Sequence, residues 1–244
     1  MIVKMLTVLA AALIGMIATH SEANEWQLKK VSANLIETQA DGKQYRYDDR
    51  ISPVDARSLY EHFKKKADDP IAAIYAAPGL KNHYIVSSWE DGTTKEDYGR
   101  RLYLVQMKGK TVKDIDRARG AGDSYVVRPV FFVAPGKLLI LAEIGTEYSW
   151  GLLAYEITNR RLVSLGSLDA AVDGEDDAED ATPYARVKFK NTYWSIEFDH
   201  DLVLAPGSQT EQRIYRMKNR PIVFEHEGKG FVPKKGSYTS QPPG

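Results

Sequence analysis

The sequence has 244 residues, 33 basic and 33 acidic, so its formal net charge is zero, and it contains no cysteine. This balance argues against a general electrostatic affinity for nucleic acid or anionic membranes, and the lack of cysteine excludes disulfide bonds. A chain of this length can bury a substantial hydrophobic core within one domain.

The first residues have the pattern of a secretory signal peptide. Lys4 supplies one positive charge, residues 5–18 are almost all apolar, and small residues stand at Ser21 and Ala23. This pattern predicts cleavage after Ala23. A membrane anchor is the alternative, but the apolar run is shorter than the ~20 residues that a membrane-spanning helix needs. We therefore expect no stable membrane anchor after cleavage of residues 1–23.

The expected location is the bacterial periplasm or the medium outside the cell. Small secreted eukaryotic domains commonly depend on disulfides, and many secreted proteins carry Asn-x-Ser/Thr glycosylation sites. The sequence has neither feature, which favours a bacterial exported protein.

The first part of the mature chain contains the one helix that we expect. Residues 26–36 alternate weakly between apolar and polar side chains and predict one strand. Ser52 suits the N-cap of a helix, Pro53 its first position and Asp55 its first turn. Apolar residues then recur at helical spacing, which predicts a helix over residues 52–67.

From residue 71 onward, apolar or alternating runs separated by turn residues predict antiparallel strands joined as four-strand meanders. Residues 124–166 hold the richest apolar supply, so we expect this central meander to form the core. The strands expected before it are residues 71–76, 83–89, 101–107 and 111–115. The strands expected after it are residues 185–190, 193–204, 213–217 and 222–225.

Repeats of about fifty residues with four strands each are typical of propeller blades. We therefore predict a mainly β, antiparallel, β-propeller-like fold. A two-sheet β-sandwich is the alternative, because three units are fewer than the ~4 blades of the smallest typical propellers. A single β-rich domain is expected over residues 24–230, and a composition rich in Gly, Pro and Lys predicts a flexible tail over residues 231–244.

Residues 169–182 contain a dense group of acidic side chains. Their mutual repulsion predicts an exposed, mobile linker between the central and the last set of strands. Carboxylate oxygens are also the ligands that calcium prefers, so a loose calcium site is the alternative, although the spacing is not that of an EF-hand. Its ligands would be Asp173, Glu175, Asp176, Asp177 and Asp180. We expect no other cofactor.

Two histidines, His200 and His226, each stand between two acidic residues. On a strand, the two flanking carboxylates share one face while the histidine points to the other. A metal site at these positions would therefore require the two triplets to meet in space.

The sequence has no Gly-x-Ser-x-Gly elbow, no His-Glu-x-x-His helix, no phosphate-binding loop and no dinucleotide fingerprint. These absences favour a protein that is not an enzyme. Paired carboxylates can lie far apart in a sequence, so a hydrolase of envelope polymers that uses carboxylates and a divalent metal is the alternative.

Aromatic residues near predicted turns are candidates for a recognition surface, because exposed Tyr and Trp provide contact area at little entropic cost. Core packing is the alternative role for each of them. These candidates are Tyr148, Trp150, Tyr193 and Trp194. We therefore predict a non-catalytic exported binding protein that recognises a protein or carbohydrate partner, an inhibitor or immunity protein being one form of it.

Overall fold

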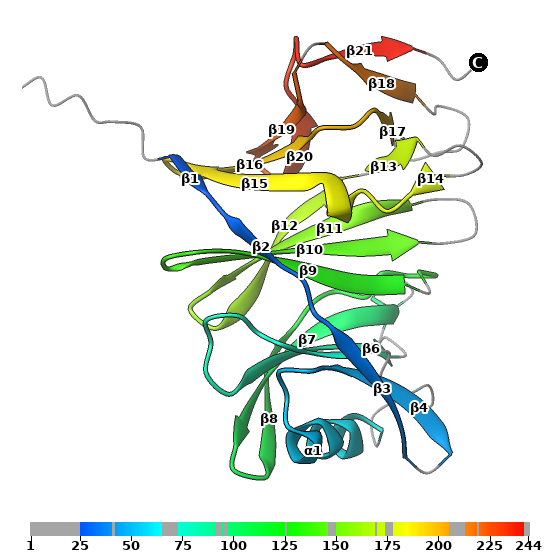
Figure 1. The fold of residues 1–244 in the computed structure, drawn as a ribbon, viewed down its shortest axis with the longest axis vertical. Coiled ribbons are helices and arrows are strands. Elements are labelled where there is room, and N and C mark those ends of the chain that lie inside the picture. The colour runs from blue at the N-terminus through cyan, green and yellow to red at the C-terminus, as the bar shows by residue number, and fades with distance from the viewer. Residues whose placement is uncertain are drawn as a thin grey trace, which may run out of the picture.

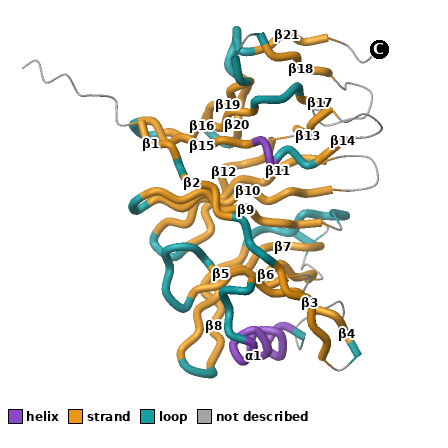
Figure 2. Tube along the Cα trace, viewed as in Figure 1, coloured by secondary structure: helices purple, strands orange, loops and turns teal. Residues whose placement is uncertain are grey.

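The structure, a computed structural model, describes residues 25–40, 42–64, 73–90, 94, 97–124, 126–145, 150–168, 170–173, 178–204, 213–218 and 220–241. Within these ranges the chain forms four β-sheets in three tiers along the long axis of the molecule, with the helix at one end (Figure 1). Strands dominate, and a short 3-10 helix, η1 (Thr182–Tyr184), adds one helical turn (Figure 2). The predicted signal peptide lies outside the described residues.

The helix-side sheet, which packs against helix α1 (Pro53–Phe63), contains the first predicted meander. Its six strands are, in spatial order, β3 (Leu35–Ala40), β4 (Lys43–Asp48), β5 (Ala73–Ala76), β6 (His83–Glu90), β7 (Gly99–Lys108) and β8 (Thr111–Arg117). All neighbours are antiparallel except β4 and β5, which pair parallel at Tyr47 and Ile74. Because α1 lies in the connection between these two strands, it supplies the crossover that a parallel pair requires. This one parallel pair lies outside the predicted meander, β5 to β8, whose pairs are all antiparallel as expected.

Helix α1 begins as the sequence predicts. The Ser52 hydroxyl accepts a hydrogen bond from the backbone N–H of Asp55 at 3.1 Å, and Pro53 occupies the first helical position. The helix ends at Phe63 rather than at residue 67. Its buried side chains pack against the helix-side sheet; they are Ala56, Leu59, Tyr60 and Phe63.

The central sheet is the middle tier and contains the predicted core meander. Its strands, in spatial order, are β12 (Arg161–Leu168), β11 (Trp150–Thr158), β10 (Lys137–Gly145), β9 (Val126–Ala134) and β2 (Lys29–Val31). Leu139 and Leu141 of β10 pack toward the third tier, whereas Ile140 and Ala142 pack toward the helix-side sheet. Both faces are therefore buried, which explains why β10 is almost continuously apolar.

Two smaller sheets form the third tier. One has the order β1 (Glu25–Gln27), β15 (Ala185–Lys190), β16 (Tyr193–Phe198), β19 (Ile222–Glu227) and β20 (Gly230–Pro233). The other has the order β14 (Ala178–Glu179), β13 (Ala170–Asp173), β17 (Leu202–Leu204), β18 (Arg213–Met217) and β21 (Tyr238–Gln241). The single strand predicted over residues 193–204 is thus two strands, β16 and β17, which belong to different sheets.

Two other expectations for this part of the chain differ from the structure. The predicted acidic linker contains β13 and β14, and Val172 and Thr182 are buried; residues 174–177 lie outside the described ranges. The predicted flexible tail contains β20 and β21, and Phe231 is buried in the core. In both segments pairing with distant strands and burial of a few apolar side chains override a polar composition.

The N-terminal segment connects three of the four sheets. Strands β1, β2 and β3 follow one another along the chain and pair with β15, β9 and β4, respectively. Figure 1 shows this segment as a blue diagonal across the tiers. The one strand predicted over residues 26–36 is therefore three short edge strands in three sheets. None of the four described sheets closes on itself, and the layering is that of a β-sandwich with an additional tier.

Candidate functional site

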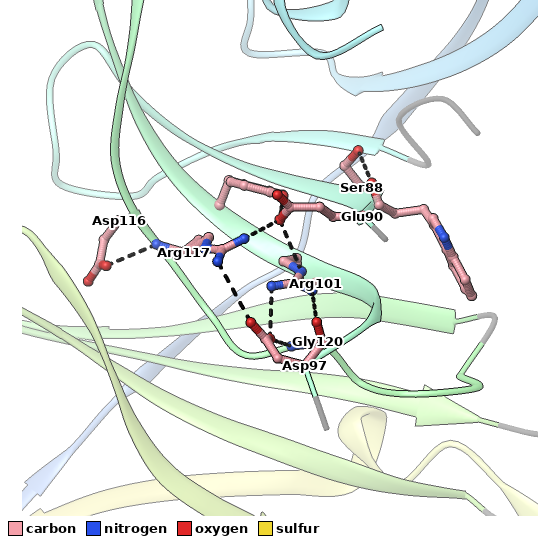
Figure 3. Close-up of polar contacts among 9 residues, drawn as sticks. Ser88, Glu90, Asp97, Arg101, Asp116, Arg117 and Gly120 are labelled. Atoms are coloured by element: carbon pink, nitrogen blue, oxygen red, sulfur yellow. Dashed lines mark hydrogen bonds and ion pairs between the residues drawn. The ribbon is translucent and has the colours of Figure 1, made fainter. Parts of the chain in front are cut away.

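Arg101 and Glu143 are two charged side chains that lie buried in the described sheets. Arg101 lies on β7, and its side chain is completely buried. Its guanidinium contacts the Asp97 carboxylate at 2.9 Å, donates to the Asp97 carbonyl at 3.0 Å, and lies 3.5 Å from the Glu90 carboxylate. Figure 3 shows Arg101 between these two acids, with Arg117 beside them. We call these four residues the Arg101 network.

The carboxylates of the Arg101 network are well supplied with donors. A hydrogen bond from the Gly120 N–H at 3.0 Å and the nearby guanidinium groups lower the pKa of Asp97. Burial acts to raise the pKa of Glu90, but hydrogen bonds from Tyr103 and Arg117 outweigh it, and the pKa is lowered. The network therefore stabilises its own charges and fixes the end of β8 against β7, which is a structural role.

Glu143 lies on β10 and is equally buried, with 1% of its surface exposed. Its partner in the sheet register is Arg128 of β9. Arg128 Nη2 donates to Glu143 Oε1 at 3.0 Å, and Arg128 Nε lies 2.7 Å from Oε2. Despite this short distance, Oε2 accepts no hydrogen bond from any described group. Glu143 is therefore held by one ion pair in which only Oε1 accepts a well-aligned hydrogen bond, which leaves part of the cost of burying the carboxylate without compensation.

The surroundings of Glu143 favour its protonated form. Burial raises the pKa of the Glu143 carboxyl, the negative charge of Asp180 raises it further, and Arg128 offsets only part of this. Asp180 is held in place by Thr182, whose N–H and hydroxyl donate to its two carboxylate oxygens at 2.8 and 2.6 Å. A carboxyl with a raised pKa beside a fixed carboxylate is typical of binding and catalytic sites.

Glu143 lines a pocket of about 160 Å³ between the helix-side sheet, the central sheet and η1. We call it the Glu143 pocket. Its polar lining consists of Ser32, Tyr75, Arg128, Glu143, Asp180 and Thr182. Burial raises the pKa of Tyr75 to about 12, so its hydroxyl stays protonated near neutral pH. Hydroxyl, carboxyl and guanidinium groups thus converge on one small space.

A second pocket of about 360 Å³ lies on the other side of η1. We call it the His200 pocket. Its polar lining consists of Gln27, Lys30, Tyr184, Arg186, Asp199 and His200. The ring of His200 lies 3.8 Å from that of Tyr184, measured between centroids, and its Nδ1 lies 3.1 Å from Asp199 Oδ1. The two rings form a fixed aromatic corner at the edge of the pocket.

The predicted calcium ligands are brought together only in part. Glu175, Asp176 and Asp177 lie outside the described residues, and for Asp173 only the backbone position in β13 is described. Asp180 lines the Glu143 pocket instead. Among the described residues there is no group of three or more His, Asp or Glu side chains that could hold a metal, and this includes the two histidine triplets. The calcium site stays a prediction.

The predicted aromatic surface is not assembled by the described side chains. Trp194 is 2% exposed, donates from its indole N–H to Glu156 at 3.3 Å and packs edge-on against Phe189. It therefore belongs to the core, and its assignment to a recognition surface is wrong. Tyr193 is half-buried on β16. Tyr148 lies outside the described residues, and only the backbone of Trp150 is described.

Glu143 and Arg128 are not among the residues that the sequence patterns predict as a site. The available signal was one acidic residue inside the apolar run of residues 138–144, opposite one basic residue in the preceding apolar run. Charged residues are rarely fully buried unless they are paired. One charged residue in each of two neighbouring apolar runs therefore indicates a buried ion pair.

No helix in the described part of the chain is long and apolar enough to span a membrane. No protein-family model matches this sequence, and neither the curated proteins nor the solved structures gave a match.

Proposed function

We propose that the protein is an exported, non-catalytic binding protein that takes one sugar unit of a carbohydrate ligand in the Glu143 pocket. The observation that carries this proposal is the buried Glu143 carboxyl, held by a single ion pair to Arg128, in a pocket that is also lined by Asp180 and hydroxyl groups. Export is supported by the N-terminal sequence pattern.

The chemistry of the lining favours a neutral ligand that is rich in hydroxyl groups. Two carboxyl groups face one guanidinium, Arg128, which is already paired with Glu143, so an anion has no free partner among them. A hydroxyl both donates and accepts hydrogen bonds. A carboxyl with a raised pKa also does both, depending on its protonation, and carboxylate and guanidinium groups can bind pairs of hydroxyls through two parallel hydrogen bonds.

The size of the pocket favours one sugar ring over a larger molecule. Pockets for drug-sized ligands are typically about 300–1,000 Å³, whereas the Glu143 pocket has about 160 Å³. In terms of liquid volume this is space for about five water molecules. A single polar ring fits this limit.

The experiment is glycan-array screening of the mature protein, followed by calorimetric titration of the strongest glycan. The Glu143→Leu variant removes both acceptors and is expected to weaken binding by about tenfold or more. Glu197→Leu is the matched control, because Glu197 is another largely buried carboxylate with a cationic partner, Lys188, but lines neither pocket. Binding that is unaffected by Glu143→Leu would contradict the proposal.

The second candidate is a glycoside hydrolase, and one observation favours it. Two carboxyl groups, Glu143 and Asp180, line one pocket, and burial raises the pKa of Glu143; a pair of carboxyls of which one has a raised pKa is the arrangement that sugar hydrolysis uses. Incubating the bound glycan with wild-type protein and analysing the products distinguishes the two functions. An intact glycan supports binding, whereas cleavage that is lost in Glu143→Gln supports hydrolysis.

A further inference from the structure

The Glu143 pocket and the His200 pocket are both lined by β9, by η1 and by the chain segment that contains β2. Lys30 of β2 lines the His200 pocket, and Ser32, two residues later, lines the Glu143 pocket. In β9, Phe132 and Val130 line the two pockets in the same way. Residues two apart on a strand share a face and lie about 7 Å apart. The pockets therefore lie side by side on one face.

Lys30 and η1 form the boundary between the pockets. Lys30 Nζ donates to the carbonyls of Thr182 and Pro183 at 2.7 and 2.8 Å. Thr182 lines the Glu143 pocket, and Pro183 lines the His200 pocket. An ammonium has three donors, so these two bonds leave one donor for a ligand that crosses the boundary. Partial burial lowers the pKa of Lys30, although Asp180 opposes this effect.

The His200 pocket offers an aromatic surface where the Glu143 pocket offers polar groups. Asp199 contacts His200 Nδ1 at 3.1 Å and also pairs with Arg186, so the imidazole is oriented and its Nε2 is left for a ligand. The centroid of the Tyr184 ring lies 3.8 Å from that of the His200 imidazole. Rigid rings with a polar edge can bind the apolar face of a sugar and one of its hydroxyls together.

We propose that the His200 pocket is the second subsite of the same site, so that the ligand is an oligosaccharide with at least two consecutive units. One unit lies in the Glu143 pocket, and the next lies against the Tyr184–His200 corner, with Lys30 between them. This inference rests on the proposed carbohydrate-binding function and adds the length of the ligand and the residues that recognise its second unit.

The test uses the wild-type mature protein and defined series of one to four units of glucose, mannose, galactose and N-acetylglucosamine. For the series that binds, the disaccharide is expected to bind about tenfold more tightly than the monosaccharide. Tyr184→Ala should abolish this gain and leave monosaccharide affinity unchanged, whereas Tyr184→Phe should keep most of it. Tyr193→Ala is the control, because Tyr193 is a half-buried aromatic that lines neither pocket.

The outcomes separate this inference from the proposed function. Equal affinity for mono- and disaccharide, or a Tyr184→Ala variant that weakens both equally, would overturn the second subsite while Glu143→Leu still tests the first. A folded wild-type protein that binds none of the four series would overturn both proposals. A gain with length that depends on Tyr184 but not on Tyr193 is the result that supports two subsites.

Discussion

Arg101 and Glu143 are both buried charges, but their partners are arranged in opposite ways. Arg101 has an exposed fraction of 0% and meets two carboxylates and a backbone carbonyl. Glu143 has an exposed fraction of 1% and meets one guanidinium, Arg128, which is itself 54% exposed. Each has one buried atom without a hydrogen bond, Arg101 Nε and Glu143 Oε2. The difference is that Arg101 faces two carboxylates, whereas Glu143 faces a single guanidinium and lines a pocket.

The two residues differ in how much of the cost of burying their charge is offset by their partners. Removing a charge from water costs free energy that its partners must offset. The Arg101 network offsets this cost and lowers the pKa values of Asp97 and Glu90. At Glu143 the cost remains as a raised pKa. A buried carboxyl whose pKa stays raised despite an ion pair marks a candidate functional site, because perturbed pKa values cluster at such sites.

The largest expected effect is the loss of stability on changing Arg101 to methionine. Methionine keeps much of the buried volume but removes the charge that Asp97 and Glu90 face, so we expect the free energy of unfolding to fall by roughly 3 kcal/mol. Urea unfolding measures this fall in the free energy of unfolding. Arg117→Met is the control; because Arg117 is 44% exposed, its change should cost about 1 kcal/mol or less. Equal losses would show that burial does not distinguish these two arginines.

The next largest effect tests how closely the chain packs around the Arg101 network. A Cβ atom at Gly120 would lie 1.9 Å from the Tyr98 carbonyl oxygen, so the backbone must move, and Gly120→Ala should cost about 1–3 kcal/mol. Gly230→Ala is the matched control, because the nearest atom to a Cβ at Gly230, the Ser167 carbonyl oxygen, would lie 4.0 Å away. Thermal unfolding of both variants measures the difference. A Gly120→Ala protein as stable as wild type would contradict this close packing.

The sequence predicted the strands that are local in the chain and failed where pairing is distant. Alternation and turn residues were sufficient for β5 to β12, because consecutive strands of a meander pair with each other. Residues 193–204 look like one strand, yet β16 pairs with β19 and β17 pairs with β18. A local pattern cannot specify which distant strand supplies the partner, and the same limit applies to β1, β2 and β3.

The candidate site was harder to predict than the fold. Glu143 and Asp180 lie on different elements, and only packing of the central sheet beneath η1 brings both to one pocket. Density of acidic residues drew attention to residues 169–182, of which only Asp180 and Thr182 line that pocket. Trp194 was selected for its position near a turn, but alternation along β16 directs it into the core. Burial and partners, which decide function here, are properties of the tertiary structure.

The smallest effect is a difference in pH dependence between the two regions. For Glu143, whose pKa is raised by burial and by Asp180, the folded protein holds the proton more tightly than the unfolded chain. Its contribution to stability is present below the unfolded pKa, about 4.3, and is lost as the pH rises through the folded value. Asp97, whose pKa is lowered, behaves oppositely: its contribution is present above the unfolded pKa, about 3.9, and is lost as the pH falls.

Glu143→Gln and Asp97→Asn therefore test the comparison directly. Glutamine cannot titrate, so the stability of Glu143→Gln relative to wild type should rise between pH 4 and pH 7, by less than the effect of Gly120→Ala. Asparagine removes a carboxylate that stabilises the fold when ionised, so the deficit of Asp97→Asn should shrink as the pH falls from 5 to 3. Urea midpoints measured across pH 3–7 give both curves. Curves that run in the same direction would mean that Glu143 is compensated as fully as the carboxylates of the Arg101 network, and the case for a ligand in the Glu143 pocket would be lost.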